Sequence, residues 1–186
     1  MTTRRLVILG KQGAGKGTQC ELLVERYGVA HISTGDVLRA AVAAGTELGR
    51  QVKEVMDAGE LVSDELILGI VAQRLTEPDT EPGFLCDGFP RTEAQAEGLF
   101  GFLAPHTIER AIDLDVPDEV VTRRMLERGR ADDTPEAIAR RLELYEAETA
   151  PLRKLFADRG VLVTVNGLGT PEQVHGRIVA AVEAAP

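Results

Sequence analysis

A glycine-rich segment near the amino terminus has the spacing of a loop that wraps phosphate groups. Its residues are Gly10-Lys11-Gln12-Gly13-Ala14-Gly15-Lys16-Gly17-Thr18. Glycines let successive backbone amides point at a ligand, Lys16 can reach β- and γ-phosphate oxygens, and Thr18 can contact a phosphate or a magnesium shell. A glycine-rich turn without a ligand is the plain alternative, but a predicted strand before the motif and a predicted helix after it favour phosphate binding.

Two further segments contain groups that can hold a second phosphate. Arg39 follows the string Ser33-Thr34-Gly35-Asp36, and Arg91 lies in the string Asp87-Gly88-Phe89-Pro90-Arg91-Thr92. Both segments follow predicted core strands, and open parallel sheets bind ligands at the carboxyl ends of their strands. We therefore expect both guanidinium groups to converge on a monoester phosphate, and Asp87 to orient water around Mg²⁺. Taken alone, each of these residues could simply be a solvent-exposed side chain or a capping group without a function. Only their joint placement favours a functional role.

Six arginines gather in one later stretch: Arg123, Arg124, Arg128, Arg130, Arg140 and Arg141. Such a patch suits a transferring phosphoryl group, whose equatorial oxygens stay charged throughout the reaction. For Arg123 and Arg140 we favour ordinary salt bridges with nearby glutamates. Asp132 and Asp133 are expected to pin this stretch rather than to bind a metal.

Strands that alternate with helices predict an α/β fold with a parallel sheet covered on both faces. Buried strands are predicted at residues 4–9, 29–33, 83–86, 110–115 and 161–165. Asp36 can cap a helix that begins after the second strand, and an amphipathic pattern beginning near Pro135 predicts one helix that extends towards Phe156. The candidate insertions are segment 33–62 and the short break around residues 128–133.

Composition limits the class of protein. A chain of 186 residues, 44% of them hydrophobic, supports one sizeable core, and no apolar run approaches the length of a membrane span or a signal peptide. The formal net charge of −9 argues against a nucleic-acid or anionic-membrane surface. Two cysteines, Cys20 and Cys86, are too few for a disulfide framework or a four-ligand zinc site. We expect a cytoplasmic monomer.

Three strings in register resemble adenylate kinase: residues 13–19, residues 33–39 and residues 87–92. The resemblance covers essentially the whole chain and implies a single domain, 1–186, with a three-layer phosphate-loop kinase fold around a five-stranded parallel sheet. It further implies a helical AMP-binding excursion at 33–62 and a short lid at 127–133 without a zinc-binding insertion. The implied reaction is reversible phosphoryl transfer from MgATP to AMP, which gives two ADP.

The resemblance also assigns residues. For ATP it implies Gly13, Ala14, Gly15, Lys16, Gly17, Thr18, Arg124, Arg128 and Gly169. For AMP it implies Thr34, Arg39, Glu60, Leu61, Val62, Gly88, Phe89, Pro90, Arg91 and Gln95, the last through an amide that can pair with an adenine edge. Arg130 and Arg141 would reach the transferring phosphoryl group, and the residues expected to act in catalysis are Lys16, Arg91, Arg124, Arg130 and Arg141. Magnesium would be held by Asp87 through water, and Thr18 is a further candidate.

Two departures and three alternatives accompany this reading. Gln12 stands where these enzymes usually have proline, and Asn166 where aspartate is common. A UMP/CMP kinase of the same fold is the nearest alternative, but Thr34 and Thr92 favour AMP. A nucleotide-binding switch lacks support because the chain has no Asn-Lys-x-Asp motif, and a structural or interaction module would leave the phosphate loop unexplained.

Overall fold

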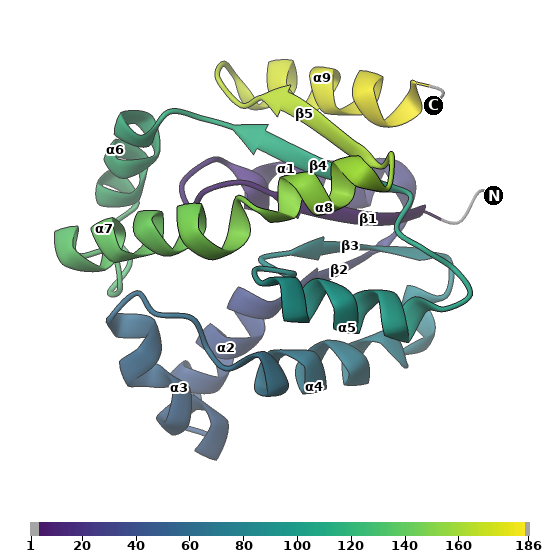
Figure 1. The fold of residues 1–186 in the computed structure, drawn as a ribbon. Helices are drawn as coiled ribbons and strands as arrows, with labels where there is room; N and C mark the ends of the chain where they lie inside the picture. The colour runs from purple at the N-terminus through teal and green to yellow at the C-terminus, as the bar shows by residue number, and fades with distance from the viewer. Residues whose placement is uncertain (1–3, 185–186) are drawn as a thin grey trace.

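The computed structural model describes residues 4–184, and the remaining residues of the predicted 1–186 domain lie outside this range. A parallel sheet in the strand order β2-β3-β1-β4-β5 forms its centre (Figure 1). The strands are β1 (Arg4–Leu9), β2 (Ala30–Ser33), β3 (Gly83–Asp87), β4 (Arg110–Asp115) and β5 (Leu162–Asn166). The structure thus confirms the predicted α/β fold with five parallel strands.

Helices cover both faces of this sheet because its strands are apolar on both sides. Alternation along β3 turns Phe84 and Cys86 towards one core cluster, and Leu85 towards the other. The first cluster includes residues of α2 (Thr34–Ala43), α3 (Glu47–Asp57), α4 (Asp64–Leu75), α5 (Glu93–Leu103) and α8 (Leu152–Asp158). The second includes residues of α1 (Lys16–Tyr27), α6 (Asp118–Arg128), α7 (Pro135–Leu144) and α9 (Pro171–Glu183).

Two helical excursions project beyond the carboxyl ends of the strands, on the left in Figure 1. One consists of α2 and α3, and the other of α6, α7 and the short connection between them. A short 3-10 turn, η1 (Pro78–Thr80), precedes β3. In the part of the chain that the structure describes, no helix is long and apolar enough to cross a membrane.

Two local predictions were wrong. The cap of α2 is Ser33, whose hydroxyl accepts a hydrogen bond from the Asp36 amide, so Asp36 lies inside the first turn. The helix predicted from Pro135 towards Phe156 is interrupted by the π-helical turn η2 (Tyr145–Thr149), in which the Ala150 amide donates to the Tyr145 carbonyl. Pro151 follows directly and has no backbone N–H, so it cannot continue the α-helical ladder.

Candidate active site

The glycine loop joins β1 to α1 and leaves backbone amides open at the start of the helix. Gly15 occupies the N-cap position with a φ of 97° and provides no side-chain cap for the first turn of α1. Gly13 has a φ of 81°, and a Cβ atom there would lie 2.6 Å from the Val121 carbonyl oxygen. Only glycine fits at this position, because the loop packs directly against the backbone of α6.

Lys16 lies in the first turn of α1 and folds back over this loop. Its Nζ donates to the carbonyl oxygens of Gly10, at 2.7 Å, and Lys11, at 2.9 Å. Burial lowers the pKa of Lys16 to about 8, although the nearby Asp87 carboxylate acts in the opposite direction. The ammonium group is therefore poised beside the loop with only neutral acceptors in direct contact.

Asp87 ends β3 next to the glycine loop, as expected for a residue that orients water on a cation. Its side chain is 14% exposed. Burial by itself raises the pKa of Asp87, but the neighbouring His31 and Lys16 more than offset this and hold it below its ordinary value. Asp87 is therefore ionised at neutral pH.

A cavity, named here the central cavity, brings most of the predicted phosphate ligands together. The predicted site residues that line it are Gly13, Gly15, Lys16, Gly17, Thr18, Arg39, Asp87, Gly88, Arg91, Arg124, Arg128 and Arg130. They come from the glycine loop and the start of α1, from α2, from the end of β3 and the loop after it, and from α6 and the residues that follow it. Cations outnumber the acidic groups in this lining, so the cavity suits a highly charged anion.

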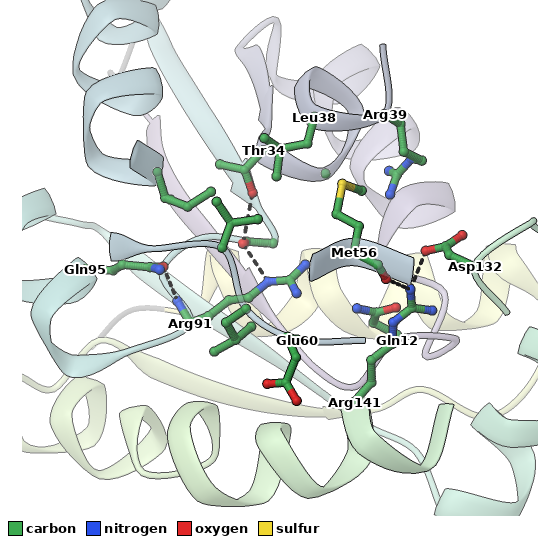
Figure 2. A pocket seen from close by; sticks show the side chains of 15 residues that line it. Gln12, Thr34, Leu38, Arg39, Met56, Glu60, Arg91, Gln95, Asp132 and Arg141 are labelled. Carbon is green, nitrogen blue, oxygen red and sulfur yellow. Dashed lines mark hydrogen bonds and ion pairs between the residues drawn. The ribbon is translucent and has the colours of Figure 1, made fainter. Parts of the chain in front are cut away.

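A second cavity, named here the Arg91 pocket, adjoins the first (Figure 2). Its lining includes Thr34, Arg39, Glu60, Leu61, Val62, Gly88, Arg91, Gln95 and Arg141. Thr34 Oγ1 and Arg91 Nε both donate to the Gly88 carbonyl, at 3.0 and 2.9 Å. Burial lowers the pKa of Arg91. The positive charges of Arg141 and Arg39 lower it further, while the Asp87 carboxylate acts in the opposite direction.

Some predicted residues contribute differently from expectation. Gln95 is 2% exposed, and its amide is already engaged, because Oε1 accepts from the Arg91 amide and Nε2 donates to Asp64. Phe89 is fully buried in the core cluster, and neither Phe89 nor Pro90 lines the Arg91 pocket. Glu60 accepts from Arg140, which confirms a salt-bridge role for Arg140.

Carboxylates hold the arginines at the base of the lid. Arg128 donates to both oxygens of Asp133, at 2.9 and 2.8 Å, and Arg141 contacts Asp133, Asp132 and the Met56 carbonyl. Burial by itself raises the pKa of Asp133, but the hydrogen bonds and charge of Arg128 lower it below its ordinary value. The expectation that Asp132 and Asp133 pin the lid is confirmed.

Helix α7 contacts the α2–α3 excursion and the turn that follows it. Arg141 of α7 donates to the Met56 carbonyl at 3.1 Å, and Arg140 reaches Glu60. Gly59 has a φ of 78°, and a Cβ atom there would lie 2.6 Å from the Ala137 carbonyl oxygen. The absence of a side chain at position 59 therefore allows the turn after α3 to approach the backbone of α7.

A third cavity, named here the Gly169 pocket, lies on the other side of the glycine loop. It is lined by Ala14, Gly15, Thr18, Gln19, Arg124, Gly167, Gly169, Pro171 and Val174. Arg124 Nη1 also points to the carbonyl oxygens of Gly13 and Ala14, at 3.4 and 3.3 Å. The predicted Gly169 is thus adjacent to the loop, although more than 150 positions separate them in sequence.

Sequence reasoning missed two residues that support the site. Asp64 accepts from Thr92 and Gln95, and Thr149 donates to the Arg91 carbonyl at 2.9 Å. Asp64 lies in the first turn of α4, where an acidic residue is common in any helix, and nothing in the sequence near Thr149 indicates a role. These contacts fix the Arg91 loop from two different helical segments.

Comparisons with known proteins identify relatives along nearly the whole chain. The family profile described as adenylate kinase matches residues 8–161. A curated adenylate kinase of Stenotrophomonas maltophilia strain K279a is 50% identical, over 97% of this chain and 100% of its own length. Similar proteins with the same name in Methylobacterium radiotolerans and Leptospira biflexa are 47% and 44% identical, over 96% of this chain and 96% and 100% of their own lengths.

Proposed function

Because the chain belongs to the adenylate kinase family and is an ATP:AMP phosphotransferase, we propose how the three cavities described above divide the two substrates. The central cavity takes the phosphates of ATP, the Gly169 pocket takes the adenine of ATP, and the Arg91 pocket takes AMP. One observation carries this division: Lys16, Asp87 and Arg91 line a single cavity, and Arg91 also lines the adjoining pocket. The two phosphate groups that react would therefore meet at Arg91.

The residues present fit magnesium bound with ATP. Asp87 and Thr18 place a carboxylate and a hydroxyl oxygen on the same cavity, and oxygen is the ligand that Mg²⁺ prefers. When bound, the ion would neutralise charge on the β- and γ-phosphates. Asp87 would hold it through water, and Thr18 is the further candidate.

Catalysis in this arrangement consists of positioning and charge neutralisation. Lys16 and the open amides of the glycine loop hold the β- and γ-phosphates, while Arg39 and Arg91 hold the phosphate of AMP in line with them. Arg124, Arg128, Arg130 and Arg141 neutralise the equatorial oxygens of the group in transfer. Because the acceptor is already a phosphate anion, no general base is required.

The paired arginines must change partners during this reaction. Arg128 and Arg141 are bonded to Asp132 and Asp133 in the structure, so contact with the substrate phosphates requires the lid to move and these bonds to rearrange. Closure of the short lid would also exclude water, which prevents hydrolysis of ATP. The adenine edge of AMP would likewise compete with Asp64 and the Arg91 amide for the amide of Gln95.

The proposal includes a monomer in the cytoplasm. Cys20 and Cys86 are both free and buried, as is usual in a reducing compartment. Sedimentation at enzyme concentrations that give full activity tests the monomer.

Substrate choice tests the assignment of the Arg91 pocket. A coupled assay with MgATP should give turnover with AMP that far exceeds turnover with CMP, UMP or GMP. Thr34 lines the pocket and Thr92 fixes Asp64 beside Gln95, which are the positions that favour AMP in this chain. A preference for a pyrimidine monophosphate would contradict this assignment.

A further inference from the structure

A thiol, an imidazole and a carboxylate meet at the edge of the central cavity. They belong to Cys20 of α1, His31 of β2 and Asp87 of β3. One ligand atom from each residue lies within 4.8 Å of the other two, and His31 Nε2 is 3.7 Å from Asp87 Oδ2. Asp87 also lines the central cavity, so this cluster is continuous with the phosphate site.

The sheet register and the helix period bring these three residues together. Ser33 pairs with Asp87 across β2 and β3, so His31, two residues earlier, lies on the same face as Asp87. Helix α1 covers this face, and Cys20 follows Lys16 by one helical turn, which puts both side chains on one side of the helix. The juxtaposition is therefore built from regular structure rather than from a mobile loop.

One nitrogen atom of the cluster has no hydrogen-bond partner. His31 Nε2 is buried and has no hydrogen-bond partner among residues 4–184. A separation of 3.7 Å from the carboxylate is too long for a hydrogen bond. Zinc–nitrogen and zinc–oxygen bonds of about 2.0–2.2 Å place two such ligand atoms about 3.3–3.6 Å apart in a tetrahedral site, so a small approach of these two atoms would let both reach one cation.

We propose that Cys20, His31 and Asp87 form a binding site for a borderline or soft divalent cation such as Zn²⁺ or Cd²⁺. Sulfur and imidazole nitrogen suit these cations, whereas Mg²⁺ requires oxygen and gains nothing from a thiolate. On binding, a metal–sulfur bond forms, and the thiol proton leaves to solvent. Three protein ligands leave a fourth position, which water fills.

Occupation of this site would inhibit phosphoryl transfer. The bound cation takes the Asp87 carboxylate directly, so that carboxylate can no longer orient water around magnesium. It also adds positive charge close to Lys16, which disfavours the charged ammonium form of that side chain. This consequence rests on the role proposed above for Asp87, whereas metal binding itself does not.

Direct binding is tested without nucleotide. Apo-protein is titrated with Cd²⁺ while the ultraviolet charge-transfer absorbance of a cadmium thiolate is recorded. Wild type and Cys86→Ala should bind one ion with this band, because Cys86 is buried on the opposite face of the sheet. Cys20→Ala should lose the band, and His31→Gln should bind more weakly by at least the roughly 10–100-fold typical of a residue that supports a metal site.

The outcomes are distinct. A wild-type protein without stoichiometric binding, or a Cys20→Ala protein that keeps the band, would overturn the site. Thermal melts of Cys20→Ala and Cys86→Ala control for folding, since each removes one buried sulfur from the core. If Cys20→Ala does not fold, His31→Gln decides the matter by its binding constant, because residue 31 is only partly buried.

Inhibition is tested by comparing variants in one assay mixture. Wild type, Cys86→Ala and Cys20→Ala are assayed with the same MgATP, AMP and increasing Zn²⁺, so that chelation of zinc by nucleotide affects all three equally. Zinc should inhibit wild type and Cys86→Ala at concentrations about tenfold or more below those that inhibit Cys20→Ala. Cd²⁺ binding with no such difference would refute the inhibitory role alone, whereas absence of AMP-dependent turnover without zinc would refute the proposed function.

Discussion

The glycine loop and the base of the lid hold charge in opposite ways. At the loop, open backbone amides and one lysine face the cavity, and Lys16 contacts only neutral carbonyl groups. At the lid, Arg128 and Arg141 are bonded to Asp132 and Asp133. The loop therefore presents donors that have no carboxylate partner, whereas the cations at the base of the lid are held in internal ion pairs, and the proposed phosphate binding would use the two regions differently.

The arginines of the site differ in whether a carboxylate pairs with them. Within residues 4–184, Arg91, Arg124 and Arg130 form no ion pair, whereas Arg39, Arg128 and Arg141 do. A buried cation without a carboxylate costs stability, and phosphate can relieve that cost. We therefore expect substitutions near the loop to affect turnover, and substitutions at the lid base to affect stability as well.

The largest expected effect follows the loss of the loop lysine. Lys16→Ala should reduce kcat by roughly 10³-fold or more, because no other ammonium group within residues 4–184 donates to the loop carbonyls that Lys16 contacts. Lys11→Ala is the matched control: its ammonium group forms ion pairs with Asp118 and Glu146 at the surface. Steady-state kinetics on both variants measure the difference, and wild-type turnover in Lys16→Ala would contradict the loop assignment.

Arg91→Ala should separate the two substrates. We expect kcat/KM for AMP to fall by roughly 10²–10³-fold, while the Kd for ATP in a binding titration changes far less. The free energy of unfolding should change little, since the lost guanidinium has no carboxylate partner within residues 4–184. Equal losses for both nucleotides would argue against a separate monophosphate pocket.

Asp133→Asn should show the opposite balance. It leaves Arg128 and the buried Arg141 without their shared carboxylate, which should lower the free energy of unfolding by about 3 kcal/mol. Asp57→Asn, which breaks an exposed pair with Lys53, should cost no more than about 1 kcal/mol. Urea denaturation of both variants measures this, and equal costs would remove the distinction between buried and surface pairs.

The smallest expected effect is the pH dependence of the stability that Asp133 contributes. Because the pKa of Asp133 is lowered in the folded protein, its stabilisation is complete above the unfolded pKa of about 3.9 and is lost as the pH falls through the lower folded pKa. The stability difference between wild type and Asp133→Asn should therefore shrink on acidification. Urea titrations at decreasing pH, as far as wild type stays folded, measure it; a difference that grew would reverse the sign assigned here.

Regular elements were predictable from the sequence because each leaves a local signal. The strand ends carrying Asp87 and the loop carrying Lys16 follow short apolar runs, so the sheet edge and its phosphate ligands could be placed together. The break in the helix after Leu144 could not be predicted, because the apolar spacing continues through Tyr145 although a π turn widens the hydrogen-bond ladder there.

Contacts between distant segments were the main part of the site that the sequence did not indicate. Asp64 meets Gln95 across 31 positions, and Thr149 meets Arg91 across 58, without any local pattern at either end. Likewise, the sequence predicts that these arginines bind phosphate, but the way Asp133 engages both Arg128 and Arg141 depends on the three-dimensional turn between α6 and α7.

The contact between Gly59 and Ala137 has a mechanical consequence. At this point the turn after α3 and helix α7 abut through backbone, with the Met56 carbonyl and Arg141 hydrogen-bonded beside it. Neither element can move independently, because displacing one breaks the contacts that it makes with the other. A side chain at position 59 would push the turn after α3 away from α7, and both elements would become more mobile.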